Sequence, residues 1–146
     1  TTGVPAGTTV KDFRDGSYTI EGVAYQLKGG VYTSGQTVLR IYGTEAVGDL
    51  NKDSIQDVAF ILSKFDGSST FYLVAAAIKT NNGYRPSNGL LLGSGMELKA
   101  QPISIGASEI VVNYDTRKFG EPLSTPPSVP VSKYFHVVGG TLTQLR

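Results

Sequence analysis

The sequence lacks cysteine and tryptophan and has one histidine and one methionine among its 146 residues. The absence of cysteine excludes disulfide bonds, a thiolate nucleophile, and cysteine-ligated zinc or iron–sulfur sites. The single histidine, His136, excludes any site that needs two histidine ligands from one chain. An excess of one charge sign is also absent, because 13 basic and 12 acidic residues give a net charge of +1 at pH 7. The sequence therefore shows no electrostatic signature of binding to nucleic acid or to an anionic membrane.

Long hydrophobic runs are absent as well. No stretch approaches the 18 apolar residues of a transmembrane helix. With 40% hydrophobic and 17% charged residues, the chain has the composition of a folded domain rather than of a disordered one. We expect residues 1–146 to form a single β-rich domain, in which residues 1–16 are a loosely ordered N-terminal segment with one short helical turn in residues 8–15. The chain opens at Thr1 rather than at methionine, so we expect a mature or trimmed product.

Dense turn signals separate short runs rich in β-branched and aromatic residues, which is typical of strands joined by tight turns. The turn signals include Asp15-Gly16, Gly29-Gly30, Asp66-Gly67, Asn82-Gly83 and Gly139-Gly140. Residues 36–42 (QTVLRIY) alternate between two faces, and residues 57–65 (DVAFILSKF) are apolar on both faces over their first half. No run of 11–18 residues has a 3.6-residue hydrophobic period.

Residues 69–80 (STFYLVAAAIKT) are compatible with either a strand or a helix. Three consecutive alanines favour a helix. The three-residue turn Asp66-Gly67-Ser68 before the run and Asn82-Gly83 after it favour a strand. We predict a strand that pairs with residues 57–65 in a central hairpin, with both faces buried.

Similar short runs follow in the second half of the chain, at residues 90–92, 97–105, 109–115, 133–138 and 141–145. The predicted fold class is therefore all-β, an antiparallel meander of about eight strands that forms a sandwich or a partly closed barrel, with one short N-terminal helix. Residues 120–131 (GEPLSTPPSVPV) contain four prolines, which excludes a central strand. We predict an extended loop there, acting either as a rigid connector or as a docking surface.

One segment has residues suited to metal binding. In GDLNKDSIQD, Asp49, Asn51, Asp53 and Asp57 stand at positions 1, 3, 5 and 9 of a loop, and Ile55 offers its carbonyl at position 7. This odd-position spacing is how a curled backbone directs oxygen ligands at one hard cation such as Ca²⁺. We therefore predict a weak calcium site formed by these five residues.

Two departures distinguish the segment from an EF-hand. Ser54 occupies position 6, where a calcium loop needs glycine, and Phe60 occupies position 12 in place of a bidentate glutamate. The alternative interpretation is a metal-free polar turn in which the Asp and Asn side chains accept hydrogen bonds from backbone N–H groups.

The segment GDLNKDSIQDVAFIL resembles the GDLNGDGxxDxAxxL signature of FG-GAP-like and dockerin-like loops, with Lys52 and Ser54 in place of glycine. Together with SYTIEGVAYQLKGG, STFYLVAAAIKT, NGLLLG, EIVVNYDTR and PPSVPVSKYFHVVGGTLTQL, it is similar to a family of small uncharacterised exported bacterial proteins. The resemblance implies a β-rich fold and a periplasmic, outer-envelope or secreted location. It also implies that an export leader has been removed, either an ordinary signal peptide or a lipoprotein signal. It implies no established activity.

Catalytic signatures are weak. No GxSxG-like elbow accompanies His136, and Glu45, Glu97, Glu109 and Glu121 qualify for a two-carboxylate site by residue type alone. We therefore expect a non-catalytic exported domain with a degenerate, structural calcium loop. The alternative function is an envelope interaction or inhibitor protein that binds a protein or carbohydrate partner through the proline-rich loop and exposed aromatic residues.

Overall fold

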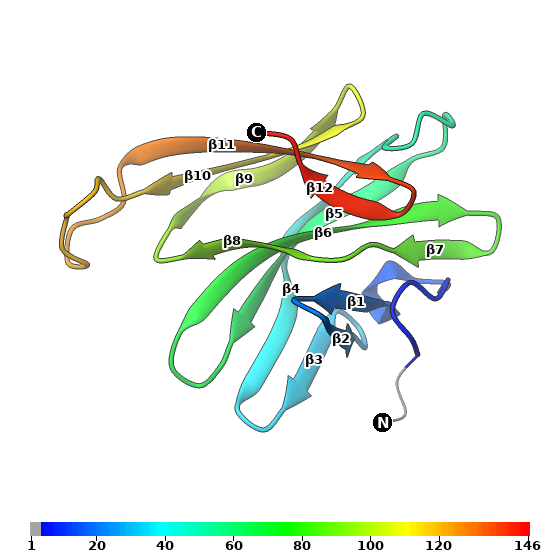
Figure 1. Cartoon of the computed structure of the whole chain (residues 1–146), viewed down its shortest axis with the longest axis horizontal. Helices are drawn as coiled ribbons and strands as arrows, with labels where there is room; N and C mark the ends of the chain where they lie inside the picture. The colour runs from blue at the N-terminus through cyan, green and yellow to red at the C-terminus, as the bar shows by residue number, and fades with distance from the viewer. Residues whose placement is uncertain (1–3) are drawn as a thin grey trace.

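The computed structural model describes residues 4–146 and contains twelve strands and one 3₁₀ turn (Figure 1). In chain order the elements are η1 (Phe13–Asp15), β1 (Ser17–Ile20), β2 (Val23–Gln26), β3 (Val31–Ser34), β4 (Thr37–Gly48), β5 (Asp57–Phe65), β6 (Thr70–Thr80), β7 (Gly83–Pro86), β8 (Leu90–Ser94), β9 (Glu97–Gly106), β10 (Glu109–Thr116), β11 (Val129–Val138) and β12 (Thr141–Gln144). All strand pairings are antiparallel apart from one isolated bridge between Ile20 and Gly89.

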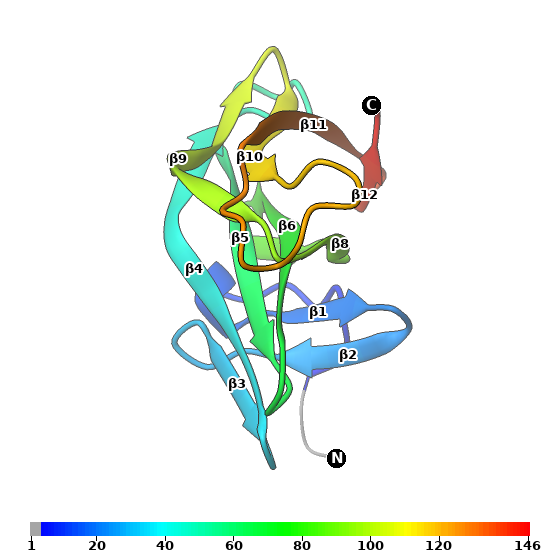
Figure 2. The same ribbon diagram turned by 90° about the vertical axis from the view of Figure 1, so that its left-hand side faces the viewer.

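The strands form three sheets. The largest has the order β3-β4-β5-β6-β7, and β8 also pairs with β6. The second has the order β12-β11-β10-β9, and the third is the β1–β2 hairpin. The four-stranded sheet packs on one face of the six-stranded sheet, so the molecule is a sandwich, and the described sheets do not close into a barrel (Figures 1 and 2).

The β5–β6 hairpin lies at the centre of the large sheet and is buried on both faces. Its register pairs Val58 with Ala77 and Phe65 with Thr70. One face packs against the four-stranded sheet, where Ile61 and Val74 meet Ile110 and other residues of β9–β12. The other face packs against the N-terminal part of the chain, which explains why both sides of these strands are apolar. The predicted central hairpin is confirmed, and β6 is a strand despite its three alanines, although it begins at Thr70 rather than at Ser69.

The N-terminal part of the chain covers the second face of the large sheet. Tyr18 and Leu27 are fully buried there, and Phe13 stacks on Phe60 with ring centroids 5.4 Å apart. Val10 forms an isolated bridge to Tyr84 of β7. Residues 4–16 are thus anchored to the domain at Val4, Val10 and Phe13, while residues 5–9 between these anchors are exposed. Residues 1–3 of the predicted N-terminal segment lie outside the described residues.

The all-β antiparallel fold class is confirmed, and the number of strands exceeds the expected eight. The extra strands include β1, β2, β3 and β7, each four residues long. Runs this short, set between glycine-containing turns, show too little alternation for recognition by periodicity. The expected N-terminal helix is the single turn η1, which the Asp12 side chain caps by accepting a hydrogen bond from Arg14 N. In residues 4–146 no helix is long and apolar enough to cross a membrane.

The proline-rich loop is shorter than predicted. Residues 117–128 connect β10 to β11, but Val129, Pro130 and Val131 belong to β11, with Pro130 opposite Asp115. Tyr134, four residues along the same strand, exchanges hydrogen bonds with the C-terminal residues on the side away from β10. By the two-residue alternation of a strand, the N atom of Pro130 faces the same side. Beyond the end of β12 that side is an open edge, where proline interrupts no ladder bond.

Candidate metal centre

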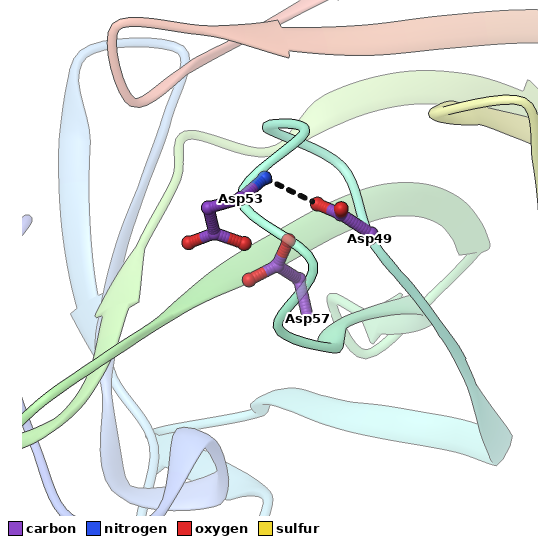
Figure 3. Close-up of side chains that lie close together, drawn as sticks. All are labelled: Asp49, Asp53 and Asp57. Carbon is purple, nitrogen blue, oxygen red and sulfur yellow. Dashed lines mark hydrogen bonds between the residues drawn. The ribbon is translucent and has the colours of Figure 1, made fainter.

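The predicted metal ligands lie in the β4–β5 connection. Asp49 directly follows β4 and Asp57 is the first residue of β5. Asp49, Asp53 and Asp57 each place a carboxylate oxygen within 4.8 Å of the others. Figure 3 shows these three side chains close together in the loop. In the described part of the chain, this is the one group of three or more His, Cys, Asp or Glu residues with ligand atoms so close together.

Asp57 is fully buried and holds the loop against the large sheet. Its Oδ2 accepts a hydrogen bond from Leu50 N at 2.8 Å, and its Oδ1 accepts one from Lys79 N at 2.8 Å. Leu50 is itself buried in the core between the two sheets. The Asp57 carboxylate therefore joins the start of the loop to the end of β6.

Asp49 organises the outer part of the loop. Its Oδ2 accepts a hydrogen bond from Ser54 N at 2.7 Å, and its Oδ1 accepts bonds from Asn51 N and Asp53 N at 3.2 and 3.3 Å. The side chain of Asp53 in turn accepts a hydrogen bond from Ile55 N at 2.9 Å. These bonds are those of the polar turn that the sequence offers as the metal-free alternative. Each carboxylate oxygen has two lone pairs, so the same geometry leaves acceptor capacity for a cation.

The amide of Asn51 lies against the carboxylates of Asp49 and Asp53. With its nitrogen directed inward, it donates to Asp53 Oδ1 at 2.8 Å and to Asp49 Oδ1 at 3.2 Å. With its oxygen directed inward, that oxygen faces only acceptors. The first orientation suits a loop without metal, and the second suits one in which a cation balances the converging oxygens.

Two residues of the loop have left-handed backbone conformations. Lys52 has φ of 61° and Ser54 has φ of 65°. These are the two positions at which the GDLNGDG pattern has glycine. The backbone at Lys52 and Ser54 thus has the left-handed conformation for which the GDLNGDG pattern has glycine, although the side chains of these two residues disfavour that conformation.

The electrostatics of Asp57 and Asp49 differ. Burial raises the pKa of Asp57, the N–H groups of Leu50 and Lys79 lower it in part, and the charges of Asp53 and Asp49 raise it further. The net direction is upward. Desolvation also raises the pKa of Asp49, but backbone N–H groups, led by that of Ser54, outweigh it and leave this pKa below its ordinary value. The cluster therefore concentrates negative charge at a buried carboxylate, which a bound cation would relieve.

The structure thus brings together Asp49, Asp53 and Asp57, with Asn51 against the first two. The N–H of Ile55 donates a hydrogen bond to the Asp53 side chain. The role of the Ile55 carbonyl as a metal ligand stays a prediction. The hydrogen bond from Lys79 N to Asp57 was missed by the sequence analysis, because the two residues are 22 positions apart and meet only through the β5–β6 pairing.

The remaining acidic candidates lie in separate places. Glu45 pairs with Arg14 at 3.2 Å, Glu109 pairs with Arg146 at 3.3 Å, and Glu121 accepts a hydrogen bond from its neighbour Lys118 N. His136 lies on β11 opposite Thr143 of β12.

In comparisons with known proteins, no family model, no curated protein and no solved structure matches this chain.

Proposed function

We propose that this chain is a non-catalytic exported β domain in which residues 49–57 bind Ca²⁺ and order the β4–β5 connection. The observation that carries the proposal is the convergence of the Asp49, Asp53 and Asp57 carboxylates within 4.8 Å. The export part rests on the resemblance of the sequence to small exported bacterial proteins. The non-catalytic part rests on the sequence, in which no spacing selects a pair of carboxylates and no GxSxG-like elbow accompanies His136.

Calcium suits this ligand set better than magnesium does. Three carboxylates, the Asn51 side-chain oxygen and the Ile55 carbonyl supply five oxygens, and water molecules complete the six to eight that Ca²⁺ takes. Mg²⁺ demands near-ideal octahedral geometry and loses its water reluctantly, so it should stabilise the protein less.

The affinity should lie at the weak end for calcium loops, on the order of 10⁻⁴–10⁻³ M, as in extracellular modules. Ser54 holds a strained conformation at position 6, and at position 12 Phe60 is buried in the core instead of offering a carboxylate. At about 1 mM calcium, these dissociation constants add roughly 0.4–1.4 kcal/mol to the free energy of unfolding. For a domain of this size, that raises Tm by about 1–6 °C.

The experiment compares thermal melts in chelator and in millimolar calcium for the native chain, Asp53→Ala and Asp66→Ala. Asp66 is a matched control because it also accepts hydrogen bonds from backbone N–H groups in an exposed turn, those of Ser68 and Ser69. We expect calcium to raise Tm of the native chain and of Asp66→Ala but not of Asp53→Ala. Equal melting temperatures of the native chain in the two buffers would refute calcium binding, and a shift that survives Asp53→Ala would move the ion elsewhere.

A second candidate function is an envelope interaction or inhibitor protein, and the β10–β11 loop favours it. Phe119 is fully exposed and Leu123 is 83% exposed. The loop that carries them is held in place by the Arg117 guanidinium, which donates to the carbonyls of Thr125 at 2.6 Å, Gly95 at 2.7 Å and Leu123 at 2.9 Å. Large apolar side chains on a preorganised loop lose little entropy when they bind a protein or carbohydrate partner.

The test uses the purified chain to capture partners from envelope extract. The variant Phe119→Ser/Leu123→Ser should lose any partner that binds this loop. Val138→Ser, which removes another exposed apolar side chain (62% exposed) from β11, should retain that partner. Equal capture by the native chain and the loop variant would refute the role of the loop.

A further inference from the structure

A second site lies between β2 and β3 and shares no residue with the metal centre. A cavity of about 990 Å³ is lined there by residues 22–24 of the first strand and its turn, and by residues 31–33 of the second. Successive residues of a strand point to opposite faces of its sheet. A cavity lined by three consecutive residues on each side therefore follows the edges of the two strands rather than a face of either.

The backbone of β2 directs hydrogen-bonding groups into this cavity. The carbonyls of Ser17 and Thr19 in β1 accept hydrogen bonds from residues outside the β1–β2 hairpin, at 3.4 and 2.8 Å. Their partners in the register are Gln26 and Ala24. In an antiparallel pair, opposite residues point their backbone groups either both inward or both outward. The N–H and C=O of Ala24 and Gln26 thus point away from β1, and both residues line the cavity.

The opposite wall has the same property. Val31 exchanges two hydrogen bonds with Lys28, of 2.9 and 3.2 Å, across the Gly29-Gly30 turn. Val31 therefore points away from β4, and so does Thr33, which lines the cavity two residues further on. Beyond this turn β2 and β3 diverge, as Figure 2 shows, and within the described residues no further pair joins them.

We propose that this groove binds an extended segment of another protein, which adds to β2 as a strand. Strand edges with unpaired N–H and C=O groups are templates for an incoming extended chain, whose backbone pairs with them. The outward groups of Ala24 and Gln26 supply that ladder, and Thr33 lies on the facing wall. A four-residue strand spans about 13 Å, so the paired part of the ligand has about four residues.

The side chains around the groove define the chemistry of the segment. Val23, Val31 and Tyr32 supply apolar contacts, and Val23 is 51% exposed. Among the described residues of the lining, Lys28 is the one with a charged side chain. The groove therefore fits a segment with alternating apolar residues and one carboxylate, and this assignment is independent of calcium.

The probe is a blocked hexapeptide of alternating valine and threonine with one glutamate, titrated to millimolar concentration while backbone amides are followed by NMR. Its matched control has the same side chains and N-methylated backbone amides. With the first peptide we expect chemical-shift changes at Ala24, Gln26 and Thr33 and slowed hydrogen exchange at Ala24 and Gln26, and with the second peptide we expect neither. Equal effects of both peptides, or no effect at these amides, would overturn the proposal. Protection that grows with protein concentration in the absence of peptide would also overturn it, because it would assign the groove to a second copy of this chain.

The variant Ala24→Pro removes one donor from the groove while leaving the β1 ladder intact, because that N–H points away from β1. Loss of one backbone hydrogen bond should weaken peptide binding by about fivefold or more. Thr33→Pro changes the facing wall and should weaken binding less, because the segment pairs with β2. Unchanged binding by Ala24→Pro would overturn the pairing. If Ala24→Pro does not fold, the NMR titration of the native chain with the two peptides still tests the pairing.

Discussion

The left-handed conformations of Lys52 and Ser54 make the metal loop a place where stability can be gained. Both side chains are exposed, and neither makes a side-chain hydrogen bond or ion pair in the described residues. Their φ values of 61° and 65° bring Cβ too close to the following carbonyl oxygen. Replacing both by glycine should therefore remove strain without removing a contact.

The expected gain follows from two opposing effects. A left-handed residue other than glycine costs about 1–2 kcal/mol. Glycine gives back about 0.4–1 kcal/mol, because it increases the conformational entropy of the unfolded chain. The net gain is about 0.5–1 kcal/mol per site, and thus about 1–2 kcal/mol for Lys52→Gly/Ser54→Gly. For a domain of this length, that corresponds to a rise in Tm of about 2–8 °C.

The assay is thermal and denaturant unfolding of the native chain and the double variant in chelator, so that no metal contributes. Ala107→Gly is the matched control, because Ala107 is an exposed residue with φ of 52° in the β9–β10 turn. It should gain about 0.5–1 kcal/mol by the same mechanism. A gain for Ala107→Gly together with a loss for the double variant would refute the reasoning, since it would show that Lys52 or Ser54 makes a stabilising contact.

Three further predictions test the core, the β10–β11 loop and an acidic turn. Leu73→Ala should lower the free energy of unfolding by about 2–5 kcal/mol in denaturant melts, because Leu73 is fully enclosed, whereas Phe71→Ala should cost less, because Phe71 is only half-buried at the end of the strand. Arg117→Lys should speed chymotrypsin cleavage of the β10–β11 loop, because lysine cannot reproduce the three hydrogen bonds that the arginine guanidinium donates. The strands that flank the loop should stay protected in hydrogen exchange, and unchanged cleavage would contradict the anchoring role of Arg117. The N–H groups of Ser69 and Ser68 lower the pKa of Asp66, so its stabilising effect is present above the unfolded pKa of about 3.9 and disappears as pH falls through the folded pKa. The stability difference between the native chain and Asp66→Asn should accordingly shift in favour of the variant on acidification, and a difference independent of pH would contradict it.

The central hairpin was predictable because two independent signals in the sequence agree. Strands β5 and β6 are apolar on both faces, and residues 66–69 between them, which begin with Asp66-Gly67-Ser68, have the length of a hairpin turn. The resulting register encloses the alanines at 75–77 between two layers, where small side chains fit against neighbours on both sides. Burial on both faces thus overrides the helix propensity of alanine.

The short strands and the groove between β2 and β3 were not predictable from periodicity. A four-residue strand such as β2 has only two residues on each face, which is too few to show an alternating pattern. Which of its residues are buried depends on the part of the structure that packs on it. Whether the edge of β2 is paired depends on how far β3 diverges after Gly29-Gly30, which is a property of the tertiary structure. The end of the proline-rich segment was also not predictable. Pro130 is compatible with β11 because its N atom faces an open edge of the sheet, and the sequence does not show which way that atom faces.

The metal loop combines a local and a non-local part, and only the local part is present in its sequence spacing. Asp49, Asn51 and Asp53 interact within five residues of one another, so odd-position spacing was enough to place them together. Asp57 differs, because its carboxylate bonds to Leu50 N in the loop and to Lys79 N in β6 at the same time. A cation bound by Asp57 would therefore act on the connection between the loop and the central sheet as well as on the turn. For this reason calcium should slow hydrogen exchange at Lys79 and Leu50 as well as at Ser54, whereas an ion held by the outer turn alone would protect Ser54 and leave Lys79 unchanged.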